Sequence, residues 1–533
     1  MISDLRGLPD GTHLDADVCI VGAGPVGIAV ARELAGSGRS VLLLETGGLD
    51  PDPAADRLND GETVGLPLPT LLGGRTRAFG GATKLWPGQC IRLDPEDLAE
   101  RAWVPHSGWP ITWADLAPYY GRAGEWFRMP RESFDEQAWR RFGMTPLPFA
   151  PGTIAHRSSM YTPIPDVGTH YRGELAAAPD VRVLLHATAT RVHADADGVT
   201  GVTVREAGGH CAHVRADTVV LCGGGIENAR LLLASDVGNA HDQVGRWFSE
   251  HPVLWIDLHV DDPRRLQEFF GLLGRGAVRY LPKLRLDPQA QRSRGALSAV
   301  ADLVWHHREP EGLAAARELS SALQGRRRPA LGPGGLRKAA GELGPVVRAG
   351  FRRFALGRPT AGPLERARLK ILFEQAPNPA SRVTLSSEVD ALGVPKARVD
   401  WRLTEADRHT AQVWTGLLDA EFRRLGVARL GAVERLGALD RLAGPDWAAG
   451  YEEACHHMGT TRMSTDPRTG VVDADGQVHG VSGLYASGSS VFPTGGYANP
   501  TLTIVALALR LADHLRHAPP RPRRTAGARD AAA

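Results

Sequence analysis

Short apolar runs separated by glycines predict a strand, a helix and a second strand near the start of the chain. Residues 17–21 are apolar enough for a buried strand, residues 28–36 have the spacing of a helix, and residues 40–44 predict another strand. A helix that joins two strands in this way is typical of a parallel βαβ unit.

Elements of both kinds follow, so the predicted fold class is mixed α/β. Residues 181–185 and 199–205 alternate like the two arms of a hairpin, and the pattern over residues 252–442 predicts a separate, mostly antiparallel sheet. Thr112 and Asp115 have the spacing of a capping box that opens a helix. Other predicted elements are strands at residues 218–221, 370–375, 397–401 and 484–486 and helices at residues 226–235 and 503–515.

Composition narrows the class of protein. With 533 residues, of which 43% are hydrophobic and 23% charged, the chain is an ordinary globular protein with two or more lobes. A net charge of +2 is too near balance for a protein that neutralises phosphates, so nucleic acid is not an expected partner. The five cysteines are scattered without metal-ligand spacing, which predicts no metal site and favours reduced thiols in the cytoplasm. The start lacks the pattern of a signal peptide, and no apolar run is long enough for a transmembrane segment.

Two segments have an unusual composition. Residues 308–358 hold eleven arginines and lysines against four acids, for which we expect a solvated surface excursion. Contact with an anionic membrane surface or an acidic partner is the alternative interpretation of the same charges. Residues 517–533 are rich in proline, arginine and alanine and predict a disordered tail.

The turn between the first strand and the helix has the pattern of a dinucleotide-binding loop. Residues 22–27 read Gly-Ala-Gly-Pro-Val-Gly, which permits a tight turn and the close approach of a pyrophosphate to a helix N-terminus. Glu45 closes the second strand 23 residues after Gly22, where its carboxylate can accept hydrogen bonds from a ribose and would repel a 2′-phosphate. The unit therefore predicts FAD or NAD as cofactor.

Two further motifs with candidate catalytic residues lie near the C-terminus. Residues 455–463 read Cys-His-His-Met-Gly-Thr-Thr-Arg-Met, and residues 498–503 read Ala-Asn-Pro-Thr-Leu-Thr. Together with the glycine loop, the glycine-rich flap at residues 73–83 and the turn at residues 223–228, these motifs resemble the glucose-methanol-choline (GMC) flavin oxidoreductases. The resemblance covers residues 17–515 and is nearest to the branch of pyranose 2-oxidase and bacterial sugar or polyol dehydrogenases.

The resemblance implies a Rossmann-type FAD lobe assembled from discontinuous segments and crossed by a substrate lobe. We assign residues 12–110, 171–250 and 448–516 to the FAD-binding domain and residues 111–170 and 251–447 to the substrate-binding domain. Members that hold FAD covalently have a histidine where this chain has Leu85, so we expect a non-covalent flavin. The implied cofactor-binding residues are Gly22, Gly24, Pro25, Val26, Gly27, Glu45, Arg75, Gly80, Gly81, Thr83, Trp86, Ala189, Gly223, Gly488, Ser489, Pro500 and Thr501.

The same resemblance implies the catalytic pair. The first histidine of the His-x-x-Gly-Thr motif falls on His456 and its partner on Asn499. His456 would take the proton of an alcohol as hydride moves to flavin N5, because a histidine with an ordinary pKa is largely neutral at working pH. His457 is expected to be structural or to reach the substrate, and Glu374 or Gln375 lines the site if its side chain faces inward.

The expected substrate is a sugar, glycoside, aminocyclitol or other polyol. An apolar alcohol such as a sterol or terpenoid is the alternative within the family, and a flavin-carrying electron-transfer component or a lyase is the alternative outside alcohol oxidation. Oxygen, a quinone or a redox protein could reoxidise the flavin, and neither the acceptor nor the oligomeric state can be inferred from the sequence.

Overall fold

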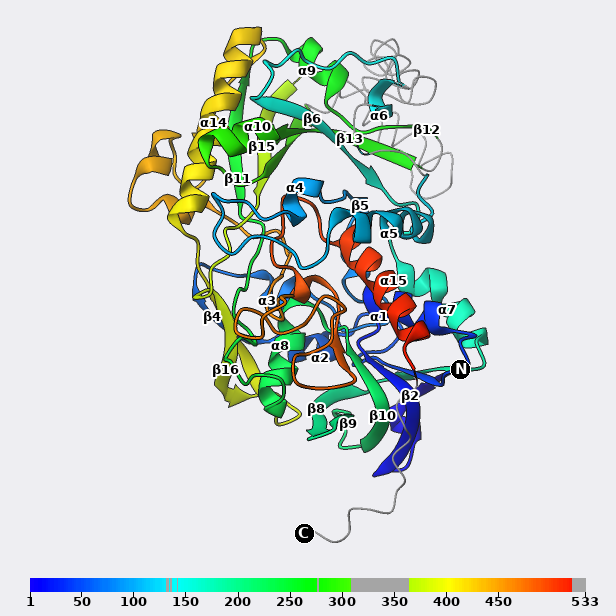
Figure 1. The fold of residues 1–533 in the computed structure, drawn as a ribbon. Helices are drawn as coiled ribbons and strands as arrows, with labels where there is room; N and C mark the ends of the chain where they lie inside the picture. Colours follow the sequence, from blue (N-terminus) through cyan, green and yellow to red (C-terminus); the bar gives the residue numbers. More distant parts are fainter. Residues whose placement is uncertain (131–133, 135–136, 141, 276–277, 308–363, 520–533) are drawn as a thin grey trace, which may run out of the picture.

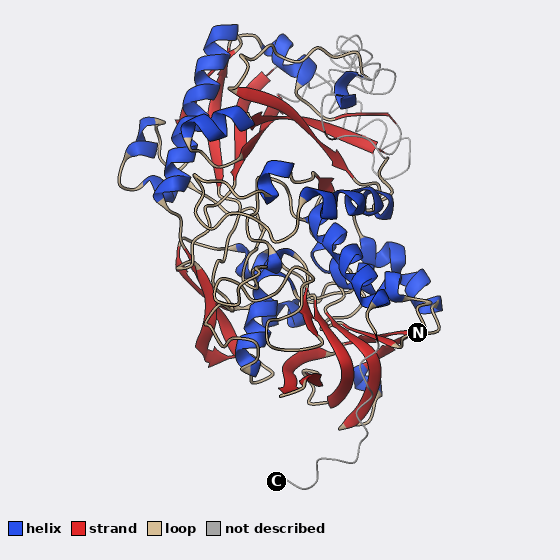
Figure 2. Ribbon diagram, viewed as in Figure 1, coloured by secondary structure: helices blue, strands red, loops and turns tan. Residues whose placement is uncertain are grey.

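The computed structural model describes residues 1–130, 134, 137–140, 142–275, 278–307 and 364–519. The predicted basic excursion at residues 308–358 and the part of the predicted tail beyond residue 519 lie outside the described residues. Two large sheets lie toward opposite ends of the molecule, with helices and loops between them (Figure 2). This arrangement confirms the predicted mixed α/β class.

The first sheet contains the predicted βαβ unit. Its strand order is β1-β7-β3-β2-β10-β9-β8, with β19 beside β10. The helix α1 (Pro25–Leu34) joins β2 to β3, and these two strands pair in parallel as predicted. The strands are β1 (Ile2–Asp4), β2 (Thr12–Val21), β3 (Val41–Leu44), β7 (Val181–Leu185), β8 (Thr188–Asp195), β9 (Gly198–Arg205), β10 (Cys211–Leu221) and β19 (Leu484–Ala486).

The predicted pairing of residues 181–185 with residues 199–205 is wrong. The strand β7 lies between β1 and β3 and is parallel to both, whereas β9 forms antiparallel pairs with β8 and β10. Four of the five β7 residues are buried, as is typical of a strand covered on both faces in a parallel sheet. The true hairpin partner, β8, has few buried positions and gave no apolar signal in the sequence.

The second sheet is mostly antiparallel, and its strand order is β18-β11-β15-β14-β13-β6-β5, with β12 beside β13. The helices α9, α10 and α14 lie on its outer side, so its other face looks toward the first sheet (Figure 1). The strands are β5 (Gln89–Cys90), β6 (Ile154–Tyr161), β11 (Val253–Val260), β12 (Leu273–Arg275), β13 (Val278–Leu286), β14 (Ala299–His307), β15 (Leu364–Phe373) and β18 (Ala428–Val433).

A small third sheet takes one strand that the sequence placed in the middle sheet. Residues 397–401 are part of β17 (Pro395–Trp401), which pairs with β16 (Arg382–Val389) and, in parallel, with β4 (Gly61–Gly65). Alternation identifies a strand and its buried face, but it does not identify the strand's neighbour. The separate sheet predicted for residues 252–442 therefore lacks this strand, and β15 ends at Phe373 rather than at residue 375.

The helices cover the sheets and fill the space between them. Thr112 and Asp115 form the predicted capping box at the start of α5. The C-terminal helix α15 packs against both α1 and α5 (Figure 1). No helix within the described ranges is long and apolar enough to cross a membrane. The helices not yet given are α2 (Pro53–Asp56), α3 (Thr70–Gly73), α4 (Pro95–Leu98), α5 (Trp113–Trp126), α6 (Gln137–Arg140), α7 (Val167–Ala177), α8 (Gly224–Ser235), α9 (Pro263–Phe269), α10 (Pro288–Arg294), α14 (Glu405–Leu425) and α15 (Thr501–His517).

Candidate active site

The β2–α1 turn has the shape that a dinucleotide loop needs. Gly22 has a φ of +103°, and a Cβ on it would lie 2.8 Å from the carbonyl oxygen of Cys222. A Cβ on Gly27 would lie 1.9 Å from the carbonyl oxygen of Gly22, so α1 can pack this closely only with glycine there. Among the residues that the structure describes, nothing fills the space beside Gly24 and no side chain caps the N-terminus of α1. Open backbone N–H groups at a helix N-terminus fit the pyrophosphate of a dinucleotide.

Glu45 lies directly beneath this turn. Its side chain is 5% exposed; Oε2 accepts the N–H of Ala23 at 3.0 Å and Oε1 accepts that of Gly47 at 2.9 Å. Burial raises the pKa of the Glu45 carboxyl. The predicted ribose acceptor therefore also holds the glycine turn in place.

The predicted flap lies against the glycine turn. The N–H of Gly80 donates to the carbonyl oxygen of Ala23 at 2.8 Å, and a Cβ on Gly81 would lie 3.0 Å from Cα of Gly24. Thr83 Oγ1 donates to the carbonyl oxygen of Gly80 at 2.6 Å, which closes the flap turn. Gly80, Gly81 and Thr83 are thus brought to the predicted cofactor loop.

Arg75, at the other end of the flap, is held by protein groups. Its guanidinium pairs with Glu227 on α8 at 2.9 Å and donates to the carbonyl oxygens of Leu71 and Asn59. Arg77 pairs with the same carboxylate at 2.8 Å. The structure therefore ties the predicted cofactor residue Arg75 to α8.

The remaining predicted cofactor residues lie on several elements. The backbone N–H of Gly223 donates to Asn228 Oδ1 at 2.7 Å, and Ser489 Oγ donates to the carbonyl oxygen of His457 at 2.7 Å. A Cβ on Gly488 would lie 3.7 Å from Val26 on α1, which brings this turn to the first βαβ unit.

Trp86 donates from Nε1 to the carbonyl oxygen of Pro165 at 2.8 Å, and Leu85 beside it is 51% exposed. Ala189 is on β8, Pro500 is the N-cap of α15 and Thr501 is its first residue.

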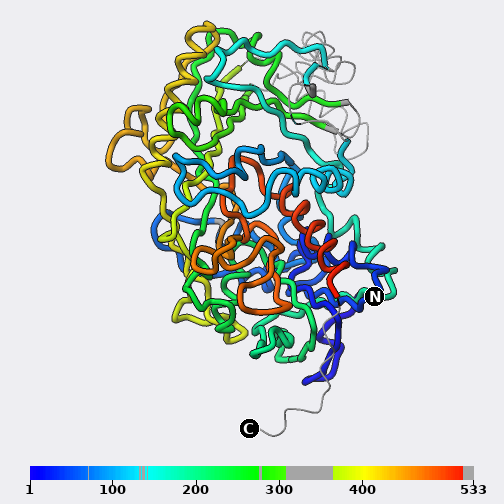
Figure 3. Tube along the Cα trace, viewed as in Figure 1, coloured from blue at the N-terminus to red at the C-terminus, as the bar shows by residue number. Residues whose placement is uncertain are grey.

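The segment that carries His456 crosses the chain near residue 249, between the two large sheets (Figure 3). Ser249 and Met458 exchange backbone hydrogen bonds of 3.0 and 2.9 Å. Gly459 has a φ of +85°, and a Cβ there would lie 2.2 Å from the carbonyl oxygen of Trp247, so glycine is required at this crossing. The crossing brings His456 beside His251.

Three polar side chains meet at this crossing. Asn499 Nδ2 lies 3.4 Å from His456 Nε2, so the structure brings the predicted catalytic pair together. His456 Nδ1 lies 2.8 Å from His251 Nδ1, and His251 Nε2 lies 2.9 Å from the carbonyl oxygen of Gly496. His251 was not identified from the sequence, because 205 positions separate it from His456 and no motif links them.

Burial and neighbouring charges keep these histidines neutral. Burial lowers the pKa of His456 well below its ordinary value, and the positive charges of Lys370 and Lys283 lower it further. Burial also lowers the pKa of His251 to about 4 and that of His457 to about 3. A neutral His456 can accept a proton at pH 7.

Glu250 is a buried carboxyl that sequence reasoning also missed. Its Oε2 accepts the backbone N–H groups of His251 at 2.8 Å and Ala454 at 3.0 Å. Burial raises its pKa to about 8. Oε1 has no hydrogen-bond partner among the described residues and lies 3.8 Å from Nε2 of His457, which places His457 beside Glu250.

Glu374 and Gln375, predicted to contact substrate if inward-facing, are both engaged with protein groups. Glu374 accepts from Arg101 at 2.8 Å and from both the backbone N–H and the hydroxyl of Ser298. Gln375 Oε1 accepts the backbone N–H of Glu250 at 3.0 Å and Nε1 of Trp401 at 2.9 Å. These contacts tie the end of β15 to the segment that carries Glu250 and His251.

The inner face of the second sheet is polar. Trp255, Lys370 and Asp302 are neighbours on β11, β15 and β14. Lys283 on β13 forms an ion pair with Asp302 and lies opposite Arg157 of β6 in the strand register. Asp94 forms ion pairs with Arg157, at 2.7 Å, and with Arg285. It also accepts a hydrogen bond from the hydroxyl of Tyr497 at 2.6 Å. Tyr497 is two residues before Asn499, so Asp94 connects this face to the predicted catalytic pair.

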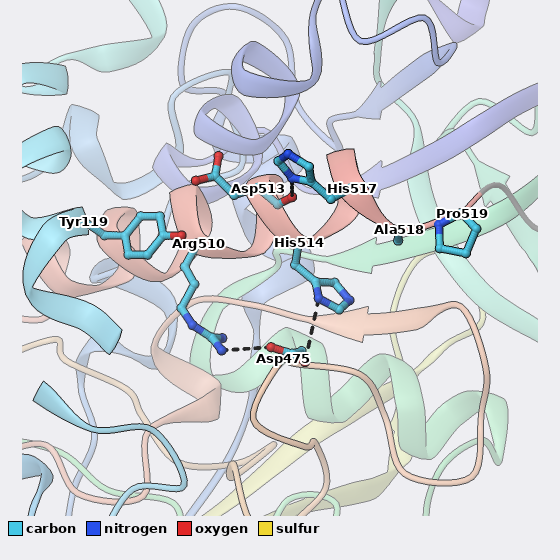
Figure 4. A pocket seen from close by; sticks show the side chains of 8 residues that line it. All are labelled: Tyr119, Asp475, Arg510, Asp513, His514, His517, Ala518 and Pro519. Atoms are coloured by element: carbon cyan, nitrogen blue, oxygen red, sulfur yellow. Dashed lines mark hydrogen bonds and ion pairs between the residues drawn. The ribbon is translucent and has the colours of Figure 1, made fainter. Parts of the chain in front are cut away.

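Two hollows lie along α15. One, of about 490 Å³, reaches Leu502 in the first turn and is also lined by Arg92, Tyr120 and Met160. The other, of about 620 Å³, lies at the C-terminal end of α15. There the carboxylate of Asp475 forms an ion pair with Arg510 and contacts His514 (Figure 4). At about 1.5 Å per residue, the length of α15 separates this second hollow from Asn499.

Comparisons with known proteins agree with the motifs. Two family models, both described as GMC oxidoreductase, match residues 171–253 and 377–508. Paromamine 6'-oxidase of Streptomyces fradiae is 27% identical over 93% of this chain and 90% of its own length. The 6'''-hydroxyparomomycin C oxidase of Streptomyces lividus is also 27% identical, over 94% and 92% respectively. A formate oxidase variant of Aspergillus oryzae, solved in work on FAD modification, has a TM-score of 0.57 at 18% identity and covers 96% of this chain and 99% of that chain.

Proposed function

Because the chain belongs to the GMC oxidoreductase family, we propose that it uses FAD to oxidise an alcohol group of a sugar, glycoside, aminocyclitol or other polyol to a carbonyl. The observation that carries this proposal is the meeting of His456 Nε2 and Asn499 Nδ2, 3.4 Å apart, at the crossing between the two sheets. A base and a hydrogen-bond donor at one point are what an alcohol oxygen needs as it loses its proton.

The described residues fit an FAD molecule. The open N-terminus of α1, the glycine turn and Glu45 would hold the ADP part, with the flap of Gly80 and Gly81 against it. The turn at Gly488 and the uncapped N-terminus of α15 would receive the rest of the cofactor. When bound, the flavin supplies the acceptor for the hydrogen and the electron pair that leave the alcohol carbon.

The protein residues handle the proton. His456 Nε2 takes the hydroxyl proton as the C–H bond breaks and the carbonyl forms, and its neutral state at pH 7 makes it able to do so. Asn499 Nδ2 donates a hydrogen bond to the same oxygen and holds the hydroxyl toward His456. Asn499 does not compete for the proton, because an amide is neither acid nor base in this pH range.

A polar substrate fits better than a sterol or terpenoid. The inner face of the second sheet carries the half-buried Trp255, Lys370 and Asp302. The positive charges of Lys370 and of the buried Lys283 are near enough to His456 to lower its pKa. An apolar ring system against this face would desolvate Lys370 and Asp302 without offering them hydrogen bonds in place of water. Two of the relatives are oxidases named for paromamine and a hydroxyparomomycin, which supports a polar substrate for this chain. It also supports a place in the sugar and polyol branch of the family.

Flavin bleaching under anaerobic conditions tests the proposal. Purified protein is mixed with a panel of sugars, glycosides, aminocyclitols and polyols, with sterols and terpenoid alcohols as the contrasting set. We expect a polyhydroxylated substrate to reduce the flavin and the His456→Ala variant to reduce it far more slowly. A flavin that stays oxidised with every alcohol would contradict the proposed reaction, and bleaching by apolar alcohols alone would contradict the substrate class. Reoxidation with oxygen, quinones and a redox protein then identifies the acceptor.

A further inference from the structure

The position of the ring protons on the two facing histidines can be worked out from their partners. His251 Nε2 is 2.9 Å from the carbonyl oxygen of Gly496. A carbonyl oxygen only accepts hydrogen bonds, so Nε2 of His251 must carry a proton and donate. Because burial keeps His251 neutral at pH 7, its other ring nitrogen, Nδ1, has no proton.

The bare nitrogen of His251 determines the protonation of His456. The two Nδ1 atoms lie 2.8 Å apart, a hydrogen-bond distance that requires one donor and one acceptor. Since His251 Nδ1 can only accept, His456 Nδ1 must carry the proton. In a neutral His456 ring, Nε2 is then unprotonated, which agrees with the donor Nδ2 of Asn499 at 3.4 Å from it.

We propose that His251 is a positioning residue that fixes His456 in the tautomer with a bare Nε2, the atom that receives the alcohol proton. This inference rests on the proposed function for the identity of that proton. His251 does not touch the alcohol; it acts by accepting from His456 Nδ1 and by donating to Gly496, three residues before Asn499. One side chain thereby aligns both members of the catalytic pair.

A neutral orienting partner has a consequence for the base. A carboxylate in the place of His251 would raise the pKa of His456 by stabilising its charged form. His251 orients the ring without a negative charge, while Lys370 and Lys283 oppose protonation. Within the described part of the chain, the other titratable groups that act on the two rings are His457, Glu374, whose charge acts on His251, and Glu250, whose carboxylate accepts the backbone N–H of His251. His456 is therefore kept neutral, and its ring is held with the bare Nε2 in a fixed orientation.

Two near-isosteric variants separate the two hydrogen bonds of His251. In His251→Asn, the amide oxygen can occupy the place of Nδ1 and accept from His456, while the bond to Gly496 is lost. In His251→Gln, the amide nitrogen can occupy the place of Nε2 and donate to Gly496, while the acceptor for His456 is lost. His259, an exposed histidine further along β11, provides the control variant His259→Gln.

The first readout is the rate of anaerobic flavin reduction across pH in the holoenzymes. We expect His251→Gln to slow reduction about 10²-fold on the high-pH plateau, His251→Asn to stay within about tenfold of wild type, and His259→Gln to be unchanged. FAD content and melting temperature identify any variant that fails to fold. Equal slowing of the Asn and Gln variants, or a normal rate in His251→Gln, would overturn the proposal.

The second readout needs no substrate. In holoenzyme labelled with ¹⁵N-histidine, with the His456→Gln variant used to identify its signals, His456 should show a protonated Nδ1 and a bare Nε2 at pH 7. His251→Gln should mix the two tautomers, and His251→Asn should retain the wild-type one. A protonated Nε2 in the wild type would refute the tautomer assignment. If the tautomer is as inferred but no alcohol bleaches the flavin, it is the proposed function that fails.

Discussion

At the scale of the residue, adjacent histidines have different surroundings. His456 has a ring nitrogen near Asn499, whereas His457 is buried beside Glu250, and its backbone carbonyl accepts from Ser489. We expect His456→Ala to slow flavin reduction by about 10² to 10⁴, the range of a general base, with near-normal FAD content. His457→Ala is the matched control and should slow the chemical step much less. A larger loss in His457→Ala, measured by rapid mixing, would reverse the assignment.

The pH dependence of the same reaction follows from the lowered pKa of His456. A base must be unprotonated to act, so the reduction rate should rise with pH through an apparent pKa below 6.5 and then level off. The inflection should disappear in His456→Ala, because the titrating group has been removed. Asn499→Asp should impair reduction and shift the inflection upward, because a carboxylate near Nε2 stabilises the protonated ring. An inflection that persists unchanged in His456→Ala would show that another group titrates.

Glu45 allows a prediction about cofactor retention. Its two oxygens accept the N–H groups of Ala23 and Gly47, and in Glu45→Gln one of them becomes an NH₂ that faces a donor. Leaving a buried donor unsatisfied costs about 1–3 kcal/mol, which the apoprotein can relieve by a shift of the glycine turn. Because FAD binding must then restore the turn, we expect FAD to bind roughly tenfold or more weakly. Fluorescence titration of the apoprotein measures this, with Glu365→Gln, at an exposed position on β15, as the control. Unchanged FAD affinity would show that Glu45 does not support the ADP site.

Sequence motifs predicted those candidate site residues that stand in short local patterns. The glycines of the β2–α1 turn, His456 and Asn499 each stand in a short pattern that has a physical reason. His251 and Glu250 could not be found this way, because their contacts arise only where two distant segments cross at Ser249 and Met458. A Glu-His pair directly before a buried strand was the signal available for them.

At the scale of the element, the end of β15 is fixed by a buried ion pair. Arg101, in the loop after α4, is 3% exposed and pairs with Glu374, which is fully buried. Burial alone would raise the pKa of Glu374, but Arg101 and Ser298 hold it below its ordinary value. We expect Glu374→Gln to destabilise the protein by about 3–5 kcal/mol, because Arg101 stays buried without a counter-charge. Urea unfolding measures this loss.

A double variant controls for simple packing changes at this pair. Arg101→Met with Glu374→Gln removes both charges, and its cost should be smaller than the sum of the two single variants. The exposed pair Arg402 and Asp400 offers a surface comparison, for which Asp400→Asn should have little effect on the unfolding midpoint. Additive costs for the buried pair would mean that its charges do not interact.

Element boundaries were predicted better than element partners. The unit β2–α1–β3 and the capping box of α5 follow from local pattern, and both are present. The pairing of β7 with β3, and of β17 with β4, depends on burial of both faces and on segments far along the chain. Periodicity records which side of a strand is buried, and it carries no information on which strand lies next to it.

At the scale of the whole molecule, contacts between distant segments join the two large sheets around the candidate site. Asp94 forms an ion pair with Arg157 of the second sheet and accepts a hydrogen bond from Tyr497, in the segment before α15. The helix α15 in turn packs on α1, which joins two strands of the first sheet. The candidate cofactor residues include Gly24 at the N-cap of α1, Gly223 at the N-cap of α8, the turn at Gly488 and the start of α15. We therefore expect FAD to contact several segments that are distant from one another in the sequence.

This arrangement predicts how the molecule responds to removal of the flavin. The resemblance places Leu85 where covalent members of the family have a histidine, so we predict that acid precipitation releases FAD into the supernatant. Flavin in the pellet would contradict non-covalent binding. Re-addition of FAD at about 100 times its dissociation constant should stabilise the apoprotein by about 2.7 kcal/mol. At equal ligand concentration ADP should raise the melting temperature less than FAD, because it would contact only the β2–α1 turn and Glu45 and so bind more weakly, whereas FAD would also reach Gly488 and the start of α15. Equal stabilisation by both ligands would mean that the flavin half makes no contact that joins these segments.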